Sequence, residues 1–254
     1  TGGDQSISGT GSVVMSDSTG NRILTNGSTI TNEAGHTIRG AGLIGLNNGG
    51  LVNKGSIIAD QSASLTLDLS LGMSNEGVVT ASGSSVIIMG VSGDSMTNAV
   101  TGRINGGGTV DVSGSSFSNQ GTISAEEGGI ATQLNIDGDV VNSGSATIDV
   151  RMAGVIQGSD FGHIEIDGNI ALNGDLDVML QSGFIPTSGD SFEIISTANG
   201  GLVSGTFSNT PGNIYAFGAG SFDVTYNATS VVLSNFNQVP EPSALALGSA
   251  ALLG

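Results

Sequence analysis

Three stretches of the chain share one pattern: LVNKGSI at residues 51–57, MSNEGVV at 73–79 and FSNQGTI at 117–123. Each reads as an apolar residue, any residue, Asn, any residue, Gly, any residue, and then Ile or Val. Three looser copies continue the pattern, and the asparagines of the six copies are Asn32, Asn53, Asn75, Asn98, Asn119 and Asn142. These asparagines recur every 21 to 23 residues, and so regular a spacing predicts a repeat architecture.

The segments between the asparagines are short and β-type. Runs such as SLTLDL (64–69) and GTVDV (108–112) alternate apolar and polar residues, which is typical of a strand with one buried face. Gly, Asn and Ser clusters separate the runs, and we expect them to supply turns with positive φ. Three such strands and three turns need about 22 residues, which is one coil of a three-sided parallel solenoid.

We therefore predict an all-β fold, a right-handed parallel β-helix (β-solenoid) with coils of about 22 residues and a β-rich C-terminal cap. Residues 1–150 form the repetitive coils, 151–236 a β-rich continuation or cap, and 237–254 a tail. A β-sandwich is the alternative, but strands paired by hairpins need no fixed spacing. Long helices are excluded because Gly and β-branched residues occur throughout and no apolar stripe of helical period runs far.

The six asparagines have two interpretations. If they occupy the same turn in successive coils, their side-chain amides stack in a ladder and each donates to the next carbonyl. Alternatively, Asn before Gly simply tolerates a left-handed turn conformation.

Composition excludes several classes of function. The chain has 254 residues, 43 of them Gly, and it lacks Cys, which rules out a disulfide scaffold, a thiolate metal site and a cysteine nucleophile. The 5 Lys and Arg against 22 Asp and Glu give a net charge of −17, which phosphate backbones repel, so we expect no nucleic-acid binding. A hydrophobic fraction of 37% argues against disorder.

Histidine and serine give no sign of nucleophilic catalysis. The chain has two histidines, His36 in a Gly-rich turn and His163 at the start of an expected strand, and we interpret both as surface or turn residues. No Gly-x-Ser-x-Gly sequence is present.

Paired carboxylates keep a carbohydrate-active enzyme open as an alternative, because parallel β-helices include polysaccharide lyases and hydrolases. The candidate groupings are Asp137 with Asp139, Glu165 with Asp167, and Asp175 with Asp177. Residues i and i+2 of a strand share a face, but any solvent-facing strand shows the same spacing. The basic residues that a lyase needs are scattered, at Arg22, Arg39, Lys54, Arg103 and Arg151. We expect no catalytic residues, no cofactor and no dedicated metal site, and interpret residues 137–139 as a plain turn in which specific Ca²⁺ binding is left open.

The part of the chain beyond residue 150 lacks the asparagine pattern and is richer in aromatic residues, which suits a terminal cap. The segments GSDF (158–161), LNGDL (172–176), SGDSF (188–192) and VSGTF (203–207) resemble a stretch common in bacterial autotransporter passengers and other large surface proteins. This resemblance implies export and no chemistry.

The tail reads Val239, Pro240, Glu241, Pro242 and Ser243, followed by 11 uncharged residues rich in Ala and Leu, ALALGSAALLG (244–254). Pro-x-Pro is an extended spacer, and the run that follows is about half of the roughly 20 residues that a membrane helix needs. This arrangement resembles the PEP-CTERM sorting signal of Gram-negative bacteria, although the rest of the helix and the Arg-rich end of that signal are missing here. The resemblance implies recognition by an exosortase-type sorting machinery, transient membrane contact and export by organisms that form exopolysaccharide and biofilm. The alternative is a tail that packs on the end of the solenoid.

These observations lead us to expect an exported, non-enzymatic structural protein of the outer cell surface or extracellular matrix of a Gram-negative bacterium. Its expected partners are the sorting machinery, through the tail, and exopolysaccharide or other surface proteins. An adhesin or glycan-binding module is the first rival, and a β-helix polysaccharide lyase or hydrolase is the second.

Overall fold

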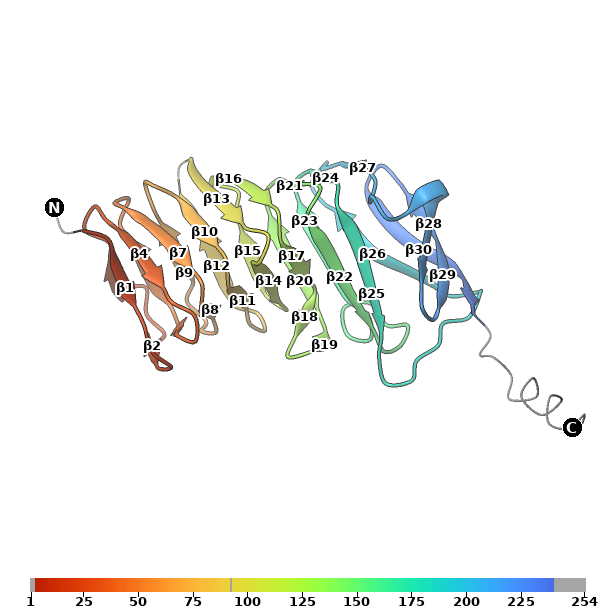
Figure 1. The fold of residues 1–254 in the computed structure, drawn as a ribbon, viewed down its shortest axis with the longest axis horizontal. Coiled ribbons are helices and arrows are strands. Elements are labelled where there is room, and N and C mark those ends of the chain that lie inside the picture. Colours follow the sequence, from red (N-terminus) through yellow and green to blue (C-terminus); the bar gives the residue numbers. More distant parts are fainter. Residues whose placement is uncertain (1–2, 92, 240–254) are drawn as a thin grey trace, which may run out of the picture.

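The computed structural model describes residues 3–91 and 93–239 and confirms the predicted β-solenoid. Three long sheets run along an elongated body, and the chain visits them in turn, coil after coil (Figure 1). Pairing between successive coils is parallel, so the sandwich alternative is wrong.

Sheet A has nine strands, in the spatial order β1 (Gln5–Ile7), β4 (Thr29–Asn32), β7 (Gly50–Asn53), β10 (Met73–Asn75), β13 (Asp94–Asn98), β16 (Ser115–Asn119), β21 (Val140–Asn142), β24 (Ile170–Leu172) and β27 (Val203–Gly205). Sheet B has eight, in the order β2 (Ser12–Val14), β5 (Thr37–Arg39), β8 (Ser56–Ala59), β11 (Val78–Ala81), β14 (Arg103–Gly106), β17 (Thr122–Ser124), β22 (Thr147–Met152) and β25 (Asp175–Leu180).

Sheet C has eleven strands, in the order β3 (Arg22–Leu24), β6 (Gly42–Gly45), β9 (Leu65–Asp68), β12 (Val86–Met89), β15 (Thr109–Asp111), β20 (Gln133–Asp137), β23 (His163–Asp167), β26 (Ser191–Thr197), β30 (Ser230–Gln238), β29 (Gly220–Tyr226) and β28 (Ile214–Phe217). A small hairpin of β18 (Glu126–Glu127) and β19 (Ile130–Ala131) and a 3-10 helix η1 (Pro211–Asn213) complete the described elements.

The core is built from inward-facing residues that repeat in register. In sheet B one such row pairs apolar side chains that are all buried: Ile38, Ile57, Val79, Ile104, Ile123, Ile148 and Leu176. The outward neighbours in these strands are mostly more exposed, which gives the alternation seen in the sequence. Because each coil buries its apolar face only against its neighbours, the coils stabilise one another.

Positive φ occurs in turns between strands, as at Gly27 and Gly83, which confirms the expected role of the Gly and Asn clusters. The glycines of the repeated pattern are required for another reason, the close stacking of successive coils. Gly55, Gly77 and Gly121 have no positive φ. A Cβ atom on Gly77 would lie 2.2 Å from the carbonyl oxygen of Gly55 in the preceding coil. The turn of one coil therefore sits directly against the turn of the next, and only Gly fits there.

Coil length changes at about residue 142. Val140 pairs with Ile170 and Ile170 pairs with Val203, so these steps are longer than the spacing between the asparagines. The extra residues lie at the corner between sheets B and C, in residues 153–162 and 181–190. The predicted boundary at residue 150 therefore falls within the parallel coils, which continue to β26 and β27.

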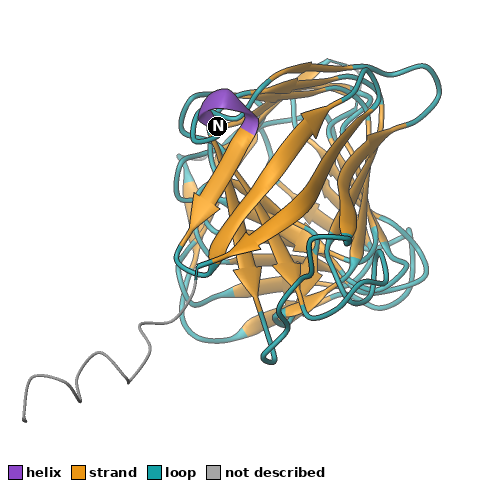
Figure 2. Cartoon of the chain, turned by 90° about the vertical axis from the view of Figure 1, so that its right-hand side faces the viewer, coloured by secondary structure: helices purple, strands orange, loops and turns teal. Residues whose placement is uncertain are grey.

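The C-terminal end is closed by an antiparallel cap. Strand β30 pairs antiparallel with both β26 and β29, and β29 pairs antiparallel with β28. Seen from this end, the cap strands lie in front of the stacked coils (Figure 2). Phe192 and Phe222 are fully buried, with ring centroids 5.9 Å apart, so large aromatic side chains fill the end of the core as the sequence predicted.

Candidate functional site

The six repeat asparagines lie in one row along sheet A, each paired with its counterpart in the next coil. All six are buried. The Nδ2 atoms donate to the Oδ1 atoms one coil further on over 2.8 Å for the first three steps, 2.7 Å from Asn98 to Asn119 and 2.9 Å from Asn119 to Asn142. None of the six has a positive φ, so the left-handed turn alternative does not apply.

Backbone carbonyls fix the orientation of the amides. The Nδ2 atom of Asn53 also donates to the carbonyl oxygen of Val78 at 3.0 Å, and Asn75 and Asn98 make the equivalent bonds at 3.2 Å. Since a carbonyl oxygen only accepts, the atom facing it must be the nitrogen. The row is therefore a directional ladder in which every inner amide is both donor and acceptor.

The two ends of the ladder differ. At the first end, Nδ1 of His36 lies 2.7 Å from Oδ1 of Asn32, which needs a donor, so His36 carries its proton on Nδ1. His36 lies in the turn between β4 and β5, as the sequence predicted, but it is buried and not at the surface, and it closes the ladder. At the other end, Nδ2 of Asn142 is buried without a hydrogen-bond partner among the described residues.

His163 is also buried, at 2% exposure, which again corrects the sequence interpretation. Burial lowers the pKa of its imidazole to about 4. Its Nε2 atom lies 3.1 Å from Oγ of Ser196 and 3.9 Å from a carboxylate oxygen of Glu193, while Nδ1 is buried without a partner in the described chain. A catalytic triad needs the carboxylate on the nitrogen opposite the serine, so this arrangement is not one.

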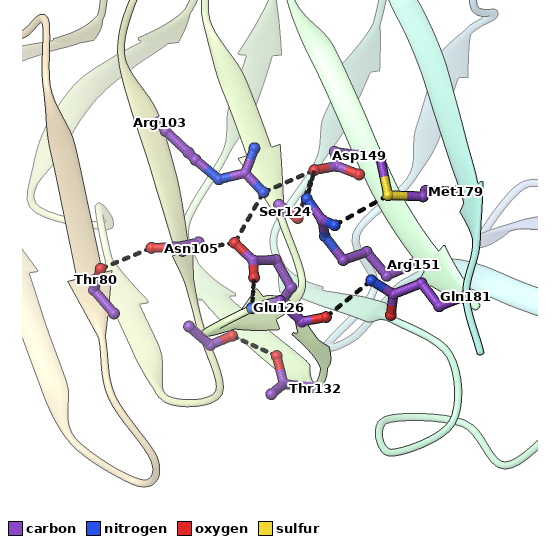
Figure 3. Close-up of polar contacts among 12 residues, drawn as sticks. Thr80, Arg103, Asn105, Ser124, Glu126, Thr132, Asp149, Arg151, Met179 and Gln181 are labelled. Carbon is purple, nitrogen blue, oxygen red and sulfur yellow. Dashed lines mark hydrogen bonds and ion pairs between the residues drawn. The ribbon is translucent and has the colours of Figure 1, made fainter. Parts of the chain in front are cut away.

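A polar cluster that the sequence did not reveal lies on the outer face of sheet B (Figure 3). Nη2 of Arg103 donates to Oε1 of Glu126 at 2.9 Å and to Oδ2 of Asp149 at 2.7 Å. Asn105 adds a bond to Glu126 at 2.9 Å, and Arg151 lies 3.5 Å from Asp149. Both carboxyl groups are largely buried, as expected for charges that are paired.

The geometry of this cluster suits an anchor. Glu126 stands on the hairpin of β18 and β19, whereas its partners stand on strands of the sheet. Burial tends to raise the pKa of Glu126, but hydrogen bonds from Asn105, Arg103 and the Gly129 N–H outweigh it, so the pKa is lowered. Glu126 is held ionised by its donors, which fits a group that ties the hairpin to the sheet and not a general acid.

A second polar surface, here called the sheet C groove, is a hollow of about 400 Å³ lined by Thr109, Gln133, Asn135, Asp137, Glu165, Asp167, Ala198 and Asn199. Register places Asp111, Asp137 and Asp167 side by side on successive strands. Burial, together with repulsion from Asp111, Asp167 and Glu165, raises the pKa of the Asp137 carboxyl. Gln133 donates to Glu165 at 3.1 Å and Asn199 to Asp167 at 2.8 Å.

The structure separates one of the three carboxylate pairs suggested by the sequence, Asp137 and Asp139, and keeps the other two together. Glu165 and Asp167 lie in the sheet C groove with Asp137, while Asp139 is engaged by Asn169 at 2.7 and 3.0 Å. Asp175 and Asp177 are exposed on sheet B. Within residues 3–91 and 93–239, no three His, Asp or Glu side chains are arranged to hold a metal ion.

The segment that resembles a sorting signal begins at the last residue that the structure describes. Val239 is exposed, and Pro240, Glu241 and Pro242 lie outside the described residues, as do residues 244–254. In the part of the chain that is described, no helix has the length and apolar character to cross a bilayer.

Comparison with known proteins adds no relative: no family model and no curated protein matches this sequence.

Proposed function

We propose that this protein is an exported, non-enzymatic structural component of the cell surface or exopolysaccharide matrix of a Gram-negative bacterium. The observation that carries the proposal is the continuous asparagine ladder, which runs with the apolar core from β4 to β21. A body whose coils are joined by core packing, strand pairing and buried hydrogen bonds resists bending and local opening. A body of this kind is suited to act as a stiff spacer.

The sorting role of the tail is part of the proposal and rests on the Pro-Glu-Pro resemblance. The test is the variant Pro240→Ala/Pro242→Ala of the full chain, expressed in its own bacterium. We expect the protein to shift from the surface and matrix fraction to the cell-associated fraction. The matched control is Pro211→Ala, which changes an exposed proline far from the tail along the chain. An unchanged distribution of the tail variant would contradict the sorting role.

The structural role is tested separately by deleting the protein and imaging the matrix. We expect a thinner or less cohesive biofilm that is restored by the full chain. Restoration by a variant with a broken ladder, at the same matrix abundance, would contradict the idea that stiffness is the function.

Glycan binding is the second candidate, and the sheet C groove is the observation that favours it. Its amides and carboxylates present donors and acceptors of the kind that fix sugar hydroxyls. Co-sedimentation with exopolysaccharide purified from the same bacterium tests it. We expect Asn135→Ala to weaken retention at least threefold and Asn237→Ala, on an exposed site outside the groove, to leave it unchanged. Release of reducing ends in the same assay would indicate a hydrolase instead.

A further inference from the structure

An apolar groove lies where the described chain ends. It has a volume of about 310 Å³, and its large side chains are Leu180, Phe184, Ile185, Phe236 and Val239. None of the residues that line it is charged, although the chain as a whole carries a net charge of −17. An uncharged apolar hollow on so acidic a surface is the kind of feature that marks an interaction site.

Three segments of the chain build this tail groove. The loop after β25 supplies Phe184 and Ile185, the turn between β28 and β29 supplies residues 218–219, and β30 with the residue after it supplies Phe236 and Val239. The loop and the end of β30 lie on the same edge of the molecule in Figure 1. Ile185 and Val239 are 54% and 56% exposed, so the groove is open.

The loop after β25 also borders a second hollow, of mixed character. This hollow of about 490 Å³ is lined by Gly129, Ile130, Ala131, Ala153, Ser159, Gln181 and Ser182, whereas the following residues of the loop line the tail groove. Ile130 is 68% exposed. The corner between sheets B and C therefore offers further surface, apolar at Ile130 and polar at Ser159 and Gln181.

The chain itself holds a segment of matching chemistry next to the groove. After Val239, four residues lead to the 11 uncharged residues 244–254, which include Leu245, Leu247, Leu252 and Leu253. Four extended residues span at most about 14 Å, so the apolar run starts within reach of the groove. A short tether of this kind holds its segment at an effective concentration in the millimolar range.

We propose that residues 244–254 dock in the tail groove, so that their leucine side chains are shielded while the chain is in water. Apolar segments laid into grooves of this kind are a recurring mode of recognition. The docking is a property of the chain itself and does not depend on the tail being a sorting signal.

Spin labelling tests the docking directly, because the described chain and the full sequence contain no Cys that would compete for the label. The variant Ser249→Cys of the full chain carries a nitroxide, and the backbone amide signals are compared before and after the nitroxide is reduced. We expect the Phe184, Ile185 and Ala219 amides to lose more than half of their intensity, and the Thr31 amide on sheet A to lose none.

Substitutions identify the groove as the site. Ile185→Asp should restore the amide intensities at least twofold, because it places a charge in the groove at an exposed position. The matched control is Ile214→Asp, on β28 outside the groove and 46% exposed, which should leave the broadening intact. In the tail, Leu247→Asp should release the segment, whereas Ser243→Asp adds the same charge before the apolar run and should not.

Three outcomes would overturn the proposal. The first is no broadening at the groove in the labelled full chain, and the second is broadening that survives Ile185→Asp while signals elsewhere remain native. The third is broadening in a mixture of labelled and separately ¹⁵N-labelled chains, because the tail would then occupy a second copy. These results are independent of the cell fractionation with the proline variants, so the failure of one proposal is distinguishable from the failure of the other.

Discussion

The interior of the solenoid is filled in two different ways. One is found in the coils between β4 and β21, and the other in the region from β24 to β30. The first region repeats one buried polar residue in register, and its coils stay within the 21 to 23 residues of the asparagine spacing. The second has no such row, makes longer coils and fills the space with aromatic rings. The ladder therefore requires a nearly constant coil length, since stacked amides need turns that superimpose.

Truncating the cap should have the largest effect. Phe222 is fully buried, with ring centroids 4.9 Å from Phe236, 5.9 Å from Phe192 and 6.0 Å from Phe217. We expect Phe222→Ala to lower the free energy of unfolding by about 4 kcal/mol, because it removes a large side chain and leaves a cavity. Urea unfolding measures this loss. A loss below about 1 kcal/mol would show that the aromatic cluster does not hold the cap.

Breaking the ladder in its middle should cost somewhat less. Asn75→Ala leaves the Nδ2 of Asn53 with the carbonyl of Val78 as its remaining acceptor and the Oδ1 of Asn98 without its donor, both buried. We expect a loss of about 3 kcal/mol in the free energy of unfolding. The matched variant is Asn142→Ala at the end of the row, where one donor is already unpaired, and its expected loss is about 1 kcal/mol. Equal losses for the two variants would contradict a directional ladder.

The two regions also differ in how far the sequence predicted them. The coils were predictable because Asn and Gly recur at one spacing, so a local pattern carries the register. The cap was predicted only as β-rich, because nothing in Phe192 or Phe222 indicates that β30 returns antiparallel to β26. The close stacking at the repeat glycines was not predicted, because close approach between coils leaves no trace within a single coil.

The candidate sites were harder to predict. Arg103 meets Glu126 only because a hairpin folds back on sheet B. That hairpin lies between Asn119 and Asn142, which keep the ordinary spacing of 23 residues, so the periodicity gives no sign of it. The sheet C groove was foreseen in part, through Glu165 and Asp167. Their meeting with Asp137 depends on a register step of changed length, which the sequence does not reveal.

Lowering the pH should destabilise the region beyond the ladder, because the buried His163 then takes up a proton. Its pKa of about 4 lies below the ordinary 6.5, so the folded state binds a proton less readily than the unfolded state between these pH values. The stability that this neutral histidine provides is present above pH 6.5 and is lost as the pH falls toward 4. Glu193, 3.9 Å away, favours the charged ring, but burial outweighs it.

The measurement is the difference in free energy of unfolding between pH 7 and pH 4.5 for the unmodified chain and for His163→Leu. We expect the unmodified chain to lose about 2 kcal/mol more than the variant over this range. Parallel curves for the two proteins would show that His163 does not titrate as its burial requires.

Relieving the repulsion in the sheet C groove should have the smallest effect. The raised pKa of Asp137 means that the folded state favours the protonated carboxyl, so ionisation at neutral pH costs stability and the cost disappears as the pH falls through the folded pKa. We expect Asp137→Asn to raise the free energy of unfolding at pH 7 by less than about 1 kcal/mol, with no gain near pH 3. Glu76→Gln, an exposed site, is the control. A gain that persists at pH 3 would assign the effect to something other than charge.

Hydrogen exchange of the six side-chain amides tests the ladder most directly. If the amides are bonded from coil to coil, the Nδ2 protons of Asn32, Asn53, Asn75, Asn98 and Asn119 exchange slowly and at similar rates, and those of Asn142 exchange faster. Rapid exchange of the inner amides, at the rate of the exposed Asn213, would show that the asparagines do not form a ladder and that the stiffness proposed for this protein has another source.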